Sequence, residues 1–557
     1  MLNIKKLIMK YKYKFLVVII LTILISLINT LLPYIIKNAI SITENVSTFN
    51  EISSKLIIIV ATYMILAIIC AIFEYIKEVC LARNTQELTY EIRQKTYQKV
   101  ISFNMDTFSN MHISTLITRM TADINNIGDF IGRILPMFVS SGIFLFVVLA
   151  VMCFINIYFA LVMIAFSLLL VAIMYKLGKK MEFYNRKSIE NTEKLNNYFG
   201  ETFSGINTIN LFNIQKERKN ELDNYNYEEV DIAKRYFKIQ SFLKPLESMT
   251  KYSIITIILY LCIQGKVAGI DIGIIYVVVS YIDKFFEPLG HTLYHYENLQ
   301  QGIVSIKRID ELLNKRENFE NIYEGEKEEK LDGNIKFTNV NFEYLENRPI
   351  LKNINFSINK GEKVALVGET GSGKTTIVNL ILGFYKINSG NILFDGKNMS
   401  DISLESIRKN VSFIQQNPFI FNDTIKRNII VSDCNNLTDE RITEILKQVG
   451  LYEKVKSLKN GIYEKVNDNM FSKGEKQLLA FARAIAKETS IYIFDEPTSN
   501  IDVESEVQLK KVIDNLSSDS TVIIIAHRPE TIKFANRILK VENGNVLQID
   551  KNHINLT

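Results

Sequence analysis

A glycine-rich segment at residues 368–376, GETGSGKTT, carries the strongest chemical signal in this 557-residue sequence. It has the spacing G-x-x-x-x-G-K-[ST] between a strand-like run, KVALV, and a helix-like run, IVNLIL. Its glycines allow backbone N–H groups to close around phosphate oxygens at a helix N-terminus, where the helix dipole favours anions. Lys374 adds a cation for the β- and γ-phosphates, and the Thr375 hydroxyl can ligate Mg²⁺. The residues predicted to bind nucleotide are Gly368, Glu369, Thr370, Gly371, Ser372, Gly373, Lys374, Thr375 and Thr376.

Two adjacent carboxylates follow an apolar run, IYIFDE, further along the chain. Asp495 at the end of this predicted strand can hold the coordination shell of Mg²⁺. Glu496 can then polarise a water molecule for attack on the γ-phosphate. The pair therefore predicts phosphoryl transfer to water.

The order of the motifs resembles that of ATP-binding cassette (ABC) transporters, in particular half-transporter exporters whose membrane domain precedes the cassette. The resemblance implies that Tyr344 stacks on adenine and that Gln416 contacts Mg²⁺ or the attacking water. It also implies that His527 contacts the γ-phosphate and that Asp502, in the D-loop SNID, belongs to the nucleotide site. The expected catalytic residues are Glu496, His527 and Gln416, and the expected Mg²⁺ ligands are Thr375, Gln416 and Asp495.

Each of these motifs has a plainer alternative. The glycine-rich segment could be a turn with an exposed lysine, and a strand that ends in Asp-Glu is common in proteins. Tyr344 could be ordinary strand packing, and His527 could be a hydrogen-bonded histidine at a strand end. The regular succession of all the motifs in one chain favours the ATP site.

The segment FSKGE occupies the place of the family signature LSGGQ. The resemblance implies that Ser472 and Gly474 contact the γ-phosphate of ATP bound on the opposite subunit, through N–H groups at a helix N-terminus. Lys473 replaces a glycine and Glu475 replaces the glutamine. A lysine still supplies its N–H group there, unless the position needs a positive φ.

The altered signature leaves the assembly open. ATP sandwiched between two cassettes requires a dimer, and heterodimeric relatives often combine an intact carboxylate and histidine with an altered signature. Relaxed signatures also occur in active homodimers, so both assemblies remain. A third interpretation is a regulatory subunit that binds ATP and gates a partner with little turnover.

Composition excludes several other classes of protein. The 65 basic and 60 acidic residues give a net charge of +5, so nothing indicates a nucleic-acid partner. The charged fraction of 22% excludes a disordered chain. A mean hydropathy of +0.09 averages two unlike halves. We therefore expect a membrane domain at residues 1–312, a linker at 313–333, and an α/β P-loop NTPase domain with a parallel core at 334–557.

The membrane half contains long uncharged runs. About 20 apolar residues cross a bilayer as a helix, so the runs predict four spans, and two shorter stretches could add two more. Hydropathy leaves four or six open, and the resemblance implies six. The expected spans cover residues 15–37, 55–79, 134–155, 157–177, 247–266 and 270–289, with Asn156 at a tight turn.

Charge asymmetry predicts the orientation in the membrane. The N-terminus and the long polar stretches are rich in lysine and arginine, whereas the first loop has neither, so the N-terminus and the cassette are expected in the cytoplasm. The expected location is the plasma membrane, as a multi-pass protein.

The transported substrate is expected to be a lipid, a drug-like small molecule or a peptide. Asp283 and Glu287 share a face of the sixth predicted span, which suits a cationic or peptide substrate. Alternatively, these acids pair internally with Lys284 or lie in a cytoplasmic extension.

Overall fold

The computed structural model describes two compact units. One contains Met1–Val100 and Ile113–Lys315, and the other contains Ile101–His112 and Arg316–Thr557. Outside the description lie residues 1–8, 46–48, 110, 265–270, 295, 316–322, 324, 326–329, 346, 432–436, 498–502, 517–518, 527 and 550–557. At residues 43–45, 49–54, 287–294, 296–297 and 503–505 only the backbone is described.

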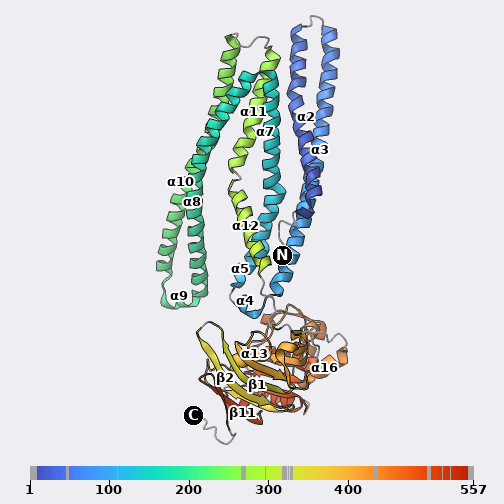
Figure 1. Ribbon diagram of the computed structural model, residues 1–557, viewed down its shortest axis with the longest axis vertical. Helices are drawn as coiled ribbons and strands as arrows, with labels where there is room; N and C mark the ends of the chain where they lie inside the picture. The colour runs from blue at the N-terminus through green and yellow to red at the C-terminus, as the bar shows by residue number, and fades with distance from the viewer. Residues whose placement is uncertain are drawn as a thin grey trace. The chain divides into compact units, whose positions relative to one another are not determined.

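The first unit is built of helices, several of them long (Figure 1). They are α2 (Lys12–Asn45), α3 (Phe49–Ile101), α5 (Ile113–Thr118), α6 (Ile124–Asp129), α7 (Leu135–Ile155), α8 (Ile157–Ser204), α9 (Ile206–Phe212), α10 (Gln215–Ile263), α11 (Ile272–Tyr294) and α12 (Tyr296–Asn314). Two π-helical turns, η1 (Arg119–Asp123) and η2 (Phe130–Ile134), flank α6. Within the described residues, five helical segments are long and apolar enough to cross a membrane. The sixth predicted span overlaps α11 and stays a prediction.

The turn predicted at Asn156 is confirmed. Asn156 has extended backbone angles between α7 and α8, and its side chain accepts a hydrogen bond from the Tyr158 N–H at 2.9 Å. This cap satisfies a backbone donor at the start of α8, so the uncharged run can reverse direction inside one residue.

Two of the long helices, α8 and α10, run side by side with α9 across their ends (Figure 1). Gly205 separates α8 from α9, and Asn213 ends α9 in the left-handed region with φ 56°. These two residues let the chain turn sharply, as expected from the small and polar residues of the segment ETFSGINTINLF.

The second unit contains the short helix α4 (Met105–Ser109) and the α/β domain. Within the described residues, six strands form a sheet in the order β12-β11-β3-β10-β9-β6, parallel except for β12. Their bounds are β3 Lys363–Val367, β6 Val411–Ile414, β9 Ile491–Asp495, β10 Thr521–Ile525, β11 Arg537–Glu542 and β12 Asn545–Ile549. The expected parallel core is confirmed.

A second, antiparallel sheet has the order β2-β1-β4-β5, and β7 pairs with β8. These strands are β1 Ile335–Glu343, β2 Pro349–Ile358, β4 Ser389–Phe394, β5 Lys397–Asn398, β7 Asp423–Thr424 and β8 Lys465–Val466. The helices are α13 Lys374–Ile381, α14 Leu404–Asn410, α15 Ile425–Ile429, α16 Asp439–Gln448, α17 Tyr452–Ser457, α18 Lys473–Lys487, α19 Val503–Asp514 and α20 Pro529–Ile532, with 3₁₀ turns at Met399–Asp401, Gly461–Tyr463 and Asp468–Met470.

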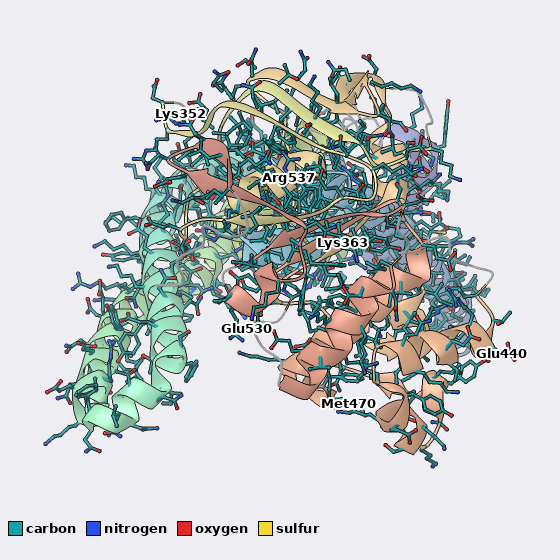
Figure 2. The ribbon with its side chains drawn as sticks, turned by 90° about the horizontal axis from the view of Figure 1, so that it is seen from below. Lys352, Lys363, Glu440, Met470, Glu530 and Arg537 are labelled. Carbon is teal, nitrogen blue, oxygen red and sulfur yellow. The ribbon has the colours of Figure 1, made fainter. Side chains whose placement is uncertain are left out.

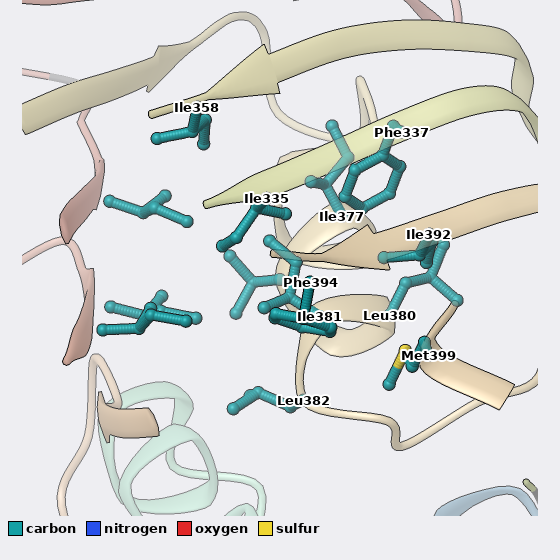
Figure 3. Close-up of a cluster of buried hydrophobic side chains, with 14 of the residues drawn as sticks. Ile335, Phe337, Ile358, Ile377, Leu380, Ile381, Leu382, Ile392, Phe394 and Met399 are labelled. Atoms are coloured by element: carbon teal, nitrogen blue, oxygen red, sulfur yellow. The ribbon is translucent and has the colours of Figure 1, made fainter. Parts of the chain in front are cut away.

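The helix α13 is anchored between the two sheets. Figure 3 shows Ile377 and Ile381 of α13 among Ile335, Phe337 and Phe394 of the antiparallel sheet. All five side chains are at most 1% exposed. Burial of one such side chain contributes about 1.5–3 kcal/mol, so the helix that follows the glycine-rich segment is held firmly in place.

Arg537 joins the two sheets next to this core. Its guanidinium donates to the Ser357 carbonyl at 3.0 Å and to Glu362 Oε1 at 3.1 Å. Figure 2 shows Arg537 close to Lys363, whose ammonium donates to the Ile513 carbonyl at 2.8 Å. Both cations therefore brace the start of β3, the strand that leads to the glycine-rich segment.

Candidate functional site

The glycine-rich segment connects the end of β3 to the start of α13 and passes close to β11. Gly368 has φ +155°, and a Cβ atom added to it would lie 2.2 Å from the Val541 carbonyl oxygen. Gly371 also has a positive φ, +84°, but open space surrounds it. Gly368 therefore requires glycine for both space and conformation, whereas Gly371 requires it for conformation alone.

Lys374 lies inside the loop, with only 5% of the residue exposed. Its ammonium donates to the carbonyls of Gly368 at 2.9 Å and Glu369 at 2.7 Å. Burial lowers the pKa of Lys374, and the nearby carboxylates of Glu496 and Asp495 oppose that change. The cation is therefore centred in the loop, where the sequence pattern predicts the phosphates.

The loop fits a polyphosphate. The hydroxyl oxygen of Ser372 is buried and has no hydrogen-bond partner within the described part of the chain. Gly373 ends the loop with φ 110°, directly before the first helical residue of α13. Backbone N–H groups at this helix N-terminus, one lysine and one unpaired hydroxyl form a donor set suited to phosphate oxygens.

The two predicted acids lie at the end of β9. Burial raises the pKa of Asp495 to about 6, the Glu496 carboxylate adds to the rise, and Lys374 opposes it. Glu496 has a left-handed backbone with φ 47°, and its N–H donates to the Ile525 carbonyl of β10 at 3.1 Å. The chain thus turns sharply between two half-buried carboxylates, the second at the edge of the sheet.

Gln416 and Glu496 are brought together. The Gln416 Nε2 donates to Glu496 Oε2 at 2.6 Å. β6 and β9 pair in parallel, so residues shortly after the two strands meet at the same edge of the sheet. Lys374 begins the helix after β3, and the charges of Glu496 and Asp495 act on its ammonium. The lysine therefore belongs to the same group of charges as these two acids.

The residues expected to bind Mg²⁺ form a suitable set of oxygen donors. Thr375 is exposed in the first turn of α13, Asp495 ends β9, and Gln416 follows β6. Mg²⁺ prefers a few carboxylate and hydroxyl oxygens together with phosphate oxygens and water, so these side chains fit the ion.

Tyr344 offers a partly exposed aromatic ring beside α13. The residue is 39% exposed, and its hydroxyl lies 3.3 Å from Thr376 Oγ1. Phe342 and Tyr385 contact the ring edge-on, with centroids at 4.8 Å and 4.9 Å. These neighbours fix the ring, so that an adenine base can stack on it.

The signature segment begins the long helix α18. Ser472 is its N-cap, and Lys473 is its first residue, with helical rather than left-handed backbone geometry. The substitution of lysine for glycine is therefore compatible with a backbone N–H directed toward the helix N-terminus. Gly474 follows within the first turn.

Two expected site residues, Asp502 and His527, lie outside the described residues, and their roles stay predictions. The strand before His527 is described: β10 lies between β3 and β9, and the Ala526 N–H donates to the Leu366 carbonyl at 3.1 Å. The end of β10 therefore lies at the same edge of the sheet as the ends of β3 and β9.

A buried network behind the site was missed by the sequence analysis. Asn428 is fully buried. Its side-chain Oδ1 accepts the Phe421 N–H at 2.9 Å, and its Nδ2 donates to the Phe421 carbonyl at 2.9 Å. Arg483 of α18 donates to Asn428 Oδ1 at 2.7 Å and to the Phe419 carbonyl at 2.6 Å. The network fastens the segment after Gln416 to the signature helix. Spacing gave no signal for it, because its members are far apart in sequence.

Comparison with known proteins agrees with this geometry. A family model described as "ABC transporter transmembrane region" matches residues 15–289, and one described as "ABC transporter" matches residues 351–499. The chain is 30% identical to the "Probable multidrug resistance ABC transporter ATP-binding/permease protein YheH" of Bacillus subtilis, over 88% of this chain and 74% of the relative. It is 28% identical to the "Multidrug resistance-like ATP-binding protein MdlB" of Buchnera aphidicola, over 91% and 87% of the two chains.

The fold of the whole chain also has a solved counterpart. A bacterial Atm1-family ABC exporter with ATP bound superposes with a TM-score of 0.80, covering 96% of this chain and 94% of that chain at 20% identity. The fold and the site define an ATP-binding cassette fused to a helical membrane domain. The chain belongs to the ABC transporter family, as a multi-pass membrane protein of the exporter type that couples ATP hydrolysis to transport.

Proposed function

We propose that this chain is one half of a dimeric exporter, in which two cassettes bind ATP between them and drive substrate outward. Its cassette residues are proposed to lie in the cytoplasm of the cell, with the membrane domain in the plasma membrane. The lysine-rich N-terminus supports this orientation, since cytoplasmic segments carry an excess of basic residues.

The observation that carries the hydrolytic mechanism is the hydrogen bond of 2.6 Å between Gln416 and Glu496. This bond holds the Gln416 amide and the Glu496 carboxylate together at the edge of the sheet where the phosphate-binding loop also begins. Glu496 would accept a proton from the attacking water, while Gln416 orients the carboxylate and the water. Lys374 would leave the loop carbonyls and neutralise the β- and γ-phosphates. Mg²⁺, when bound by Thr375, Asp495 and Gln416, supplies charge neutralisation of the phosphate oxygens.

The assignment of the base is tested with Glu496→Gln in lipid nanodiscs. This change keeps the size of the side chain and removes the proton acceptor, so steady-state Mg²⁺-dependent ATPase activity should fall about 100- to 10,000-fold. ATP-induced closure of the cassettes should persist, and spin-label distances between them measure it. Full steady-state turnover in this variant would refute the role of Glu496.

We propose a multidrug-like range of apolar or cationic substrates, with lipid and peptide substrates as the alternatives. The names of the relatives support drug-like cargo for those proteins. Within this membrane domain, Asp283 of α11 forms an ion pair with Lys251 of α10, and Lys284 donates to the Asn29 carbonyl of α2 at 2.8 Å. The ion-pair partner of Asp283 is therefore Lys251, and the side chain of Glu287 lies outside the described residues.

The substrate proposal is tested with Asp283→Asn. If Asp283 recognises cations, transport and substrate-stimulated ATPase activity should fall for cationic compounds and remain unchanged for neutral ones. Unchanged transport of every cationic compound tried would refute a role of Asp283 in the pathway.

A second candidate is a partner subunit of a heterodimeric exporter with one weakened ATP site. The specific observation that favours it is Glu475, which places a carboxylate in the first turn of α18. Purified alone in lipid, a competent homodimeric pump hydrolyses ATP, whereas such a subunit gains activity only when a second half-transporter is added.

A further inference from the structure

The N-terminus of α18 is occupied by the chain's own carboxylate. Ser472 Oγ accepts the Glu475 N–H at 3.2 Å, and Glu475 Oε2 accepts the Ser472 N–H at 2.8 Å. This reciprocal arrangement is a capping box, which satisfies two backbone donors at the start of a helix. The serine hydroxyl and the first turn expected to meet ATP are therefore already engaged.

A lysine from a different helix completes this arrangement. The Lys454 ammonium, on α17, lies 2.5 Å from Glu475 Oε2 and 5.1 Å from the centroid of the Phe471 ring. It also lies 3.5 Å from the carbonyl oxygen of Met470. Lys454 is thus fixed by three groups around the signature and acts as the counter-ion of Glu475.

Glu475 is ionised at neutral pH in this environment. Burial by itself would raise the pKa of Glu475, but the Lys454 ammonium and the Ser472 donors outweigh burial and hold the pKa below its usual range. Backbone N–H groups at a helix N-terminus attract anions, so an internal carboxylate competes with any external anion for the same groups. A glutamine could make the same capping box without a charge.

We propose that Glu475 acts as an internal anion that lowers the affinity of this signature for the γ-phosphate of ATP, and that Lys454 limits the effect as its counter-ion. The inference rests on the proposed function, since it needs ATP sandwiched between two cassettes. It identifies Glu475 as a residue that tunes ATP binding through Ser472 and the first turn of α18. In a homodimer both ATP sites are weakened equally, and in a heterodimer only the site completed by this signature is.

The test uses Glu475→Gln, which preserves the capping box and removes one negative charge. The full-length chain, in lipid nanodiscs and carrying Glu496→Gln to stop turnover, is titrated with Mg²⁺-ATP while spin-label distances report closure of the cassettes. The ATP concentration for half-maximal closure should fall about tenfold, equivalent to about 1.4 kcal/mol. The matched control is Glu453→Gln, which removes the charge of an exposed carboxylate next to Lys454 and should change little.

A double-mutant cycle separates charge from packing. Lys454→Met should raise the ATP requirement several-fold when Glu475 is present and have no effect in the Glu475→Gln background. Added salt should reduce the difference between the parent and the Glu475→Gln variant, because it screens partly exposed charges. Thermal unfolding of each variant confirms that the fold is retained.

The outcomes distinguish the two levels of the proposal. If Glu475→Gln and Glu453→Gln give the same closure curve as the parent, the role of Glu475 is refuted while the ATP-driven dimer stands. If the parent itself does not close with ATP, alone or with a second half-transporter, the proposed function fails and the inference fails with it.

Discussion

Glu496 shows how the backbone prepares a carboxylate for chemistry at the scale of a single residue. A left-handed conformation at a non-glycine residue costs about 1–3 kcal/mol and persists only where neighbouring groups enforce it. Here the enforcing groups are the Ile525 carbonyl, which accepts the Glu496 N–H at 3.1 Å, and the Gln416 amide. The strain directs Glu496 away from the path of β9, toward the edge where the phosphate-binding loop lies.

Gln416 should therefore control the rate of hydrolysis more than the affinity for ATP. Gln416→Ala removes the amide that holds Glu496, and we expect kcat to fall about 10- to 100-fold with little change in KM. Steady-state ATPase assays over a range of Mg²⁺-ATP concentrations measure both constants. Gln415→Ala, at the exposed neighbouring residue, is the control and should retain normal kcat. A rise in KM alone would contradict the role given to Gln416.

The two glycines of the loop predict different costs of substitution. Gly368→Ala introduces a Cβ atom 2.2 Å from the Val541 carbonyl at a positive φ, so β3 and β11 must separate. We expect a loss of about 3 kcal/mol or more in unfolding free energy, together with loss of ATP binding. Gly371→Ala has only the conformational penalty, about 1–2 kcal/mol. Thermal unfolding with and without ATP measures both, and equal losses would refute the steric argument.

At the scale of elements, the signature helix α18 and the segment after Gln416 are joined by buried hydrogen bonds. Asn428 and Arg483 join them through hydrogen bonds to backbone carbonyls, and burial lowers the pKa of the Arg483 guanidinium without neutralising it at physiological pH. A movement of α18, if ATP binding causes one, would therefore act on residues 419–428 through these hydrogen bonds. The parallel pairing of β6 with β9 extends this connection to Glu496.

Asn428→Ala tests the strength of this connection. It removes an amide that bonds Phe421 and Arg483 and leaves buried polar groups without partners, so we expect a loss of about 2–4 kcal/mol in stability. Arg427→Ala, at an exposed neighbour paired with Asp423, is the control and should change stability by less than about 1 kcal/mol. Denaturant unfolding of the full chain in lipid measures the cassette transition, and equal effects of the two changes would contradict the network.

Sequence alone predicted the motifs but not their contacts. The loop and the acids were predicted because phosphate chemistry requires particular residue types at fixed spacing, whereas Tyr344 followed only from the family resemblance. The contact of Gln416 with Glu496 depends on the order of strands in the sheet, and a single sequence does not determine which strands become neighbours. The pairing of Lys454 with Glu475 likewise depends on where the tertiary fold places Lys454 of α17 relative to the start of α18. His527 and Asp502 remain predictions from the motif order.

At the scale of the whole molecule, the division of hydropathy along the chain predicted a helical membrane domain followed by an α/β cassette, because lipid and water select different residue patterns. Charges inside the membrane half were harder to interpret. Asp283 was interpreted as a candidate for binding cargo or for pairing with its neighbour Lys284. The partner is Lys251, on a different helix, which periodicity along α11 does not reveal.

The Lys251–Asp283 pair predicts coupled effects on stability. Asp283→Asn leaves the Lys251 ammonium without its partner, and because the two side chains are 27% and 47% exposed, we expect the free energy of unfolding to fall by about 1 kcal/mol. Lys251→Met combined with Asp283→Asn removes both charges and should restore most of that loss, because neither charge remains to be solvated. Thermal unfolding in nanodiscs measures the cycle, with Lys251→Met as the second single variant. If the double variant is as unstable as the sum of the two single variants, the ion pair does not hold α10 and α11 together.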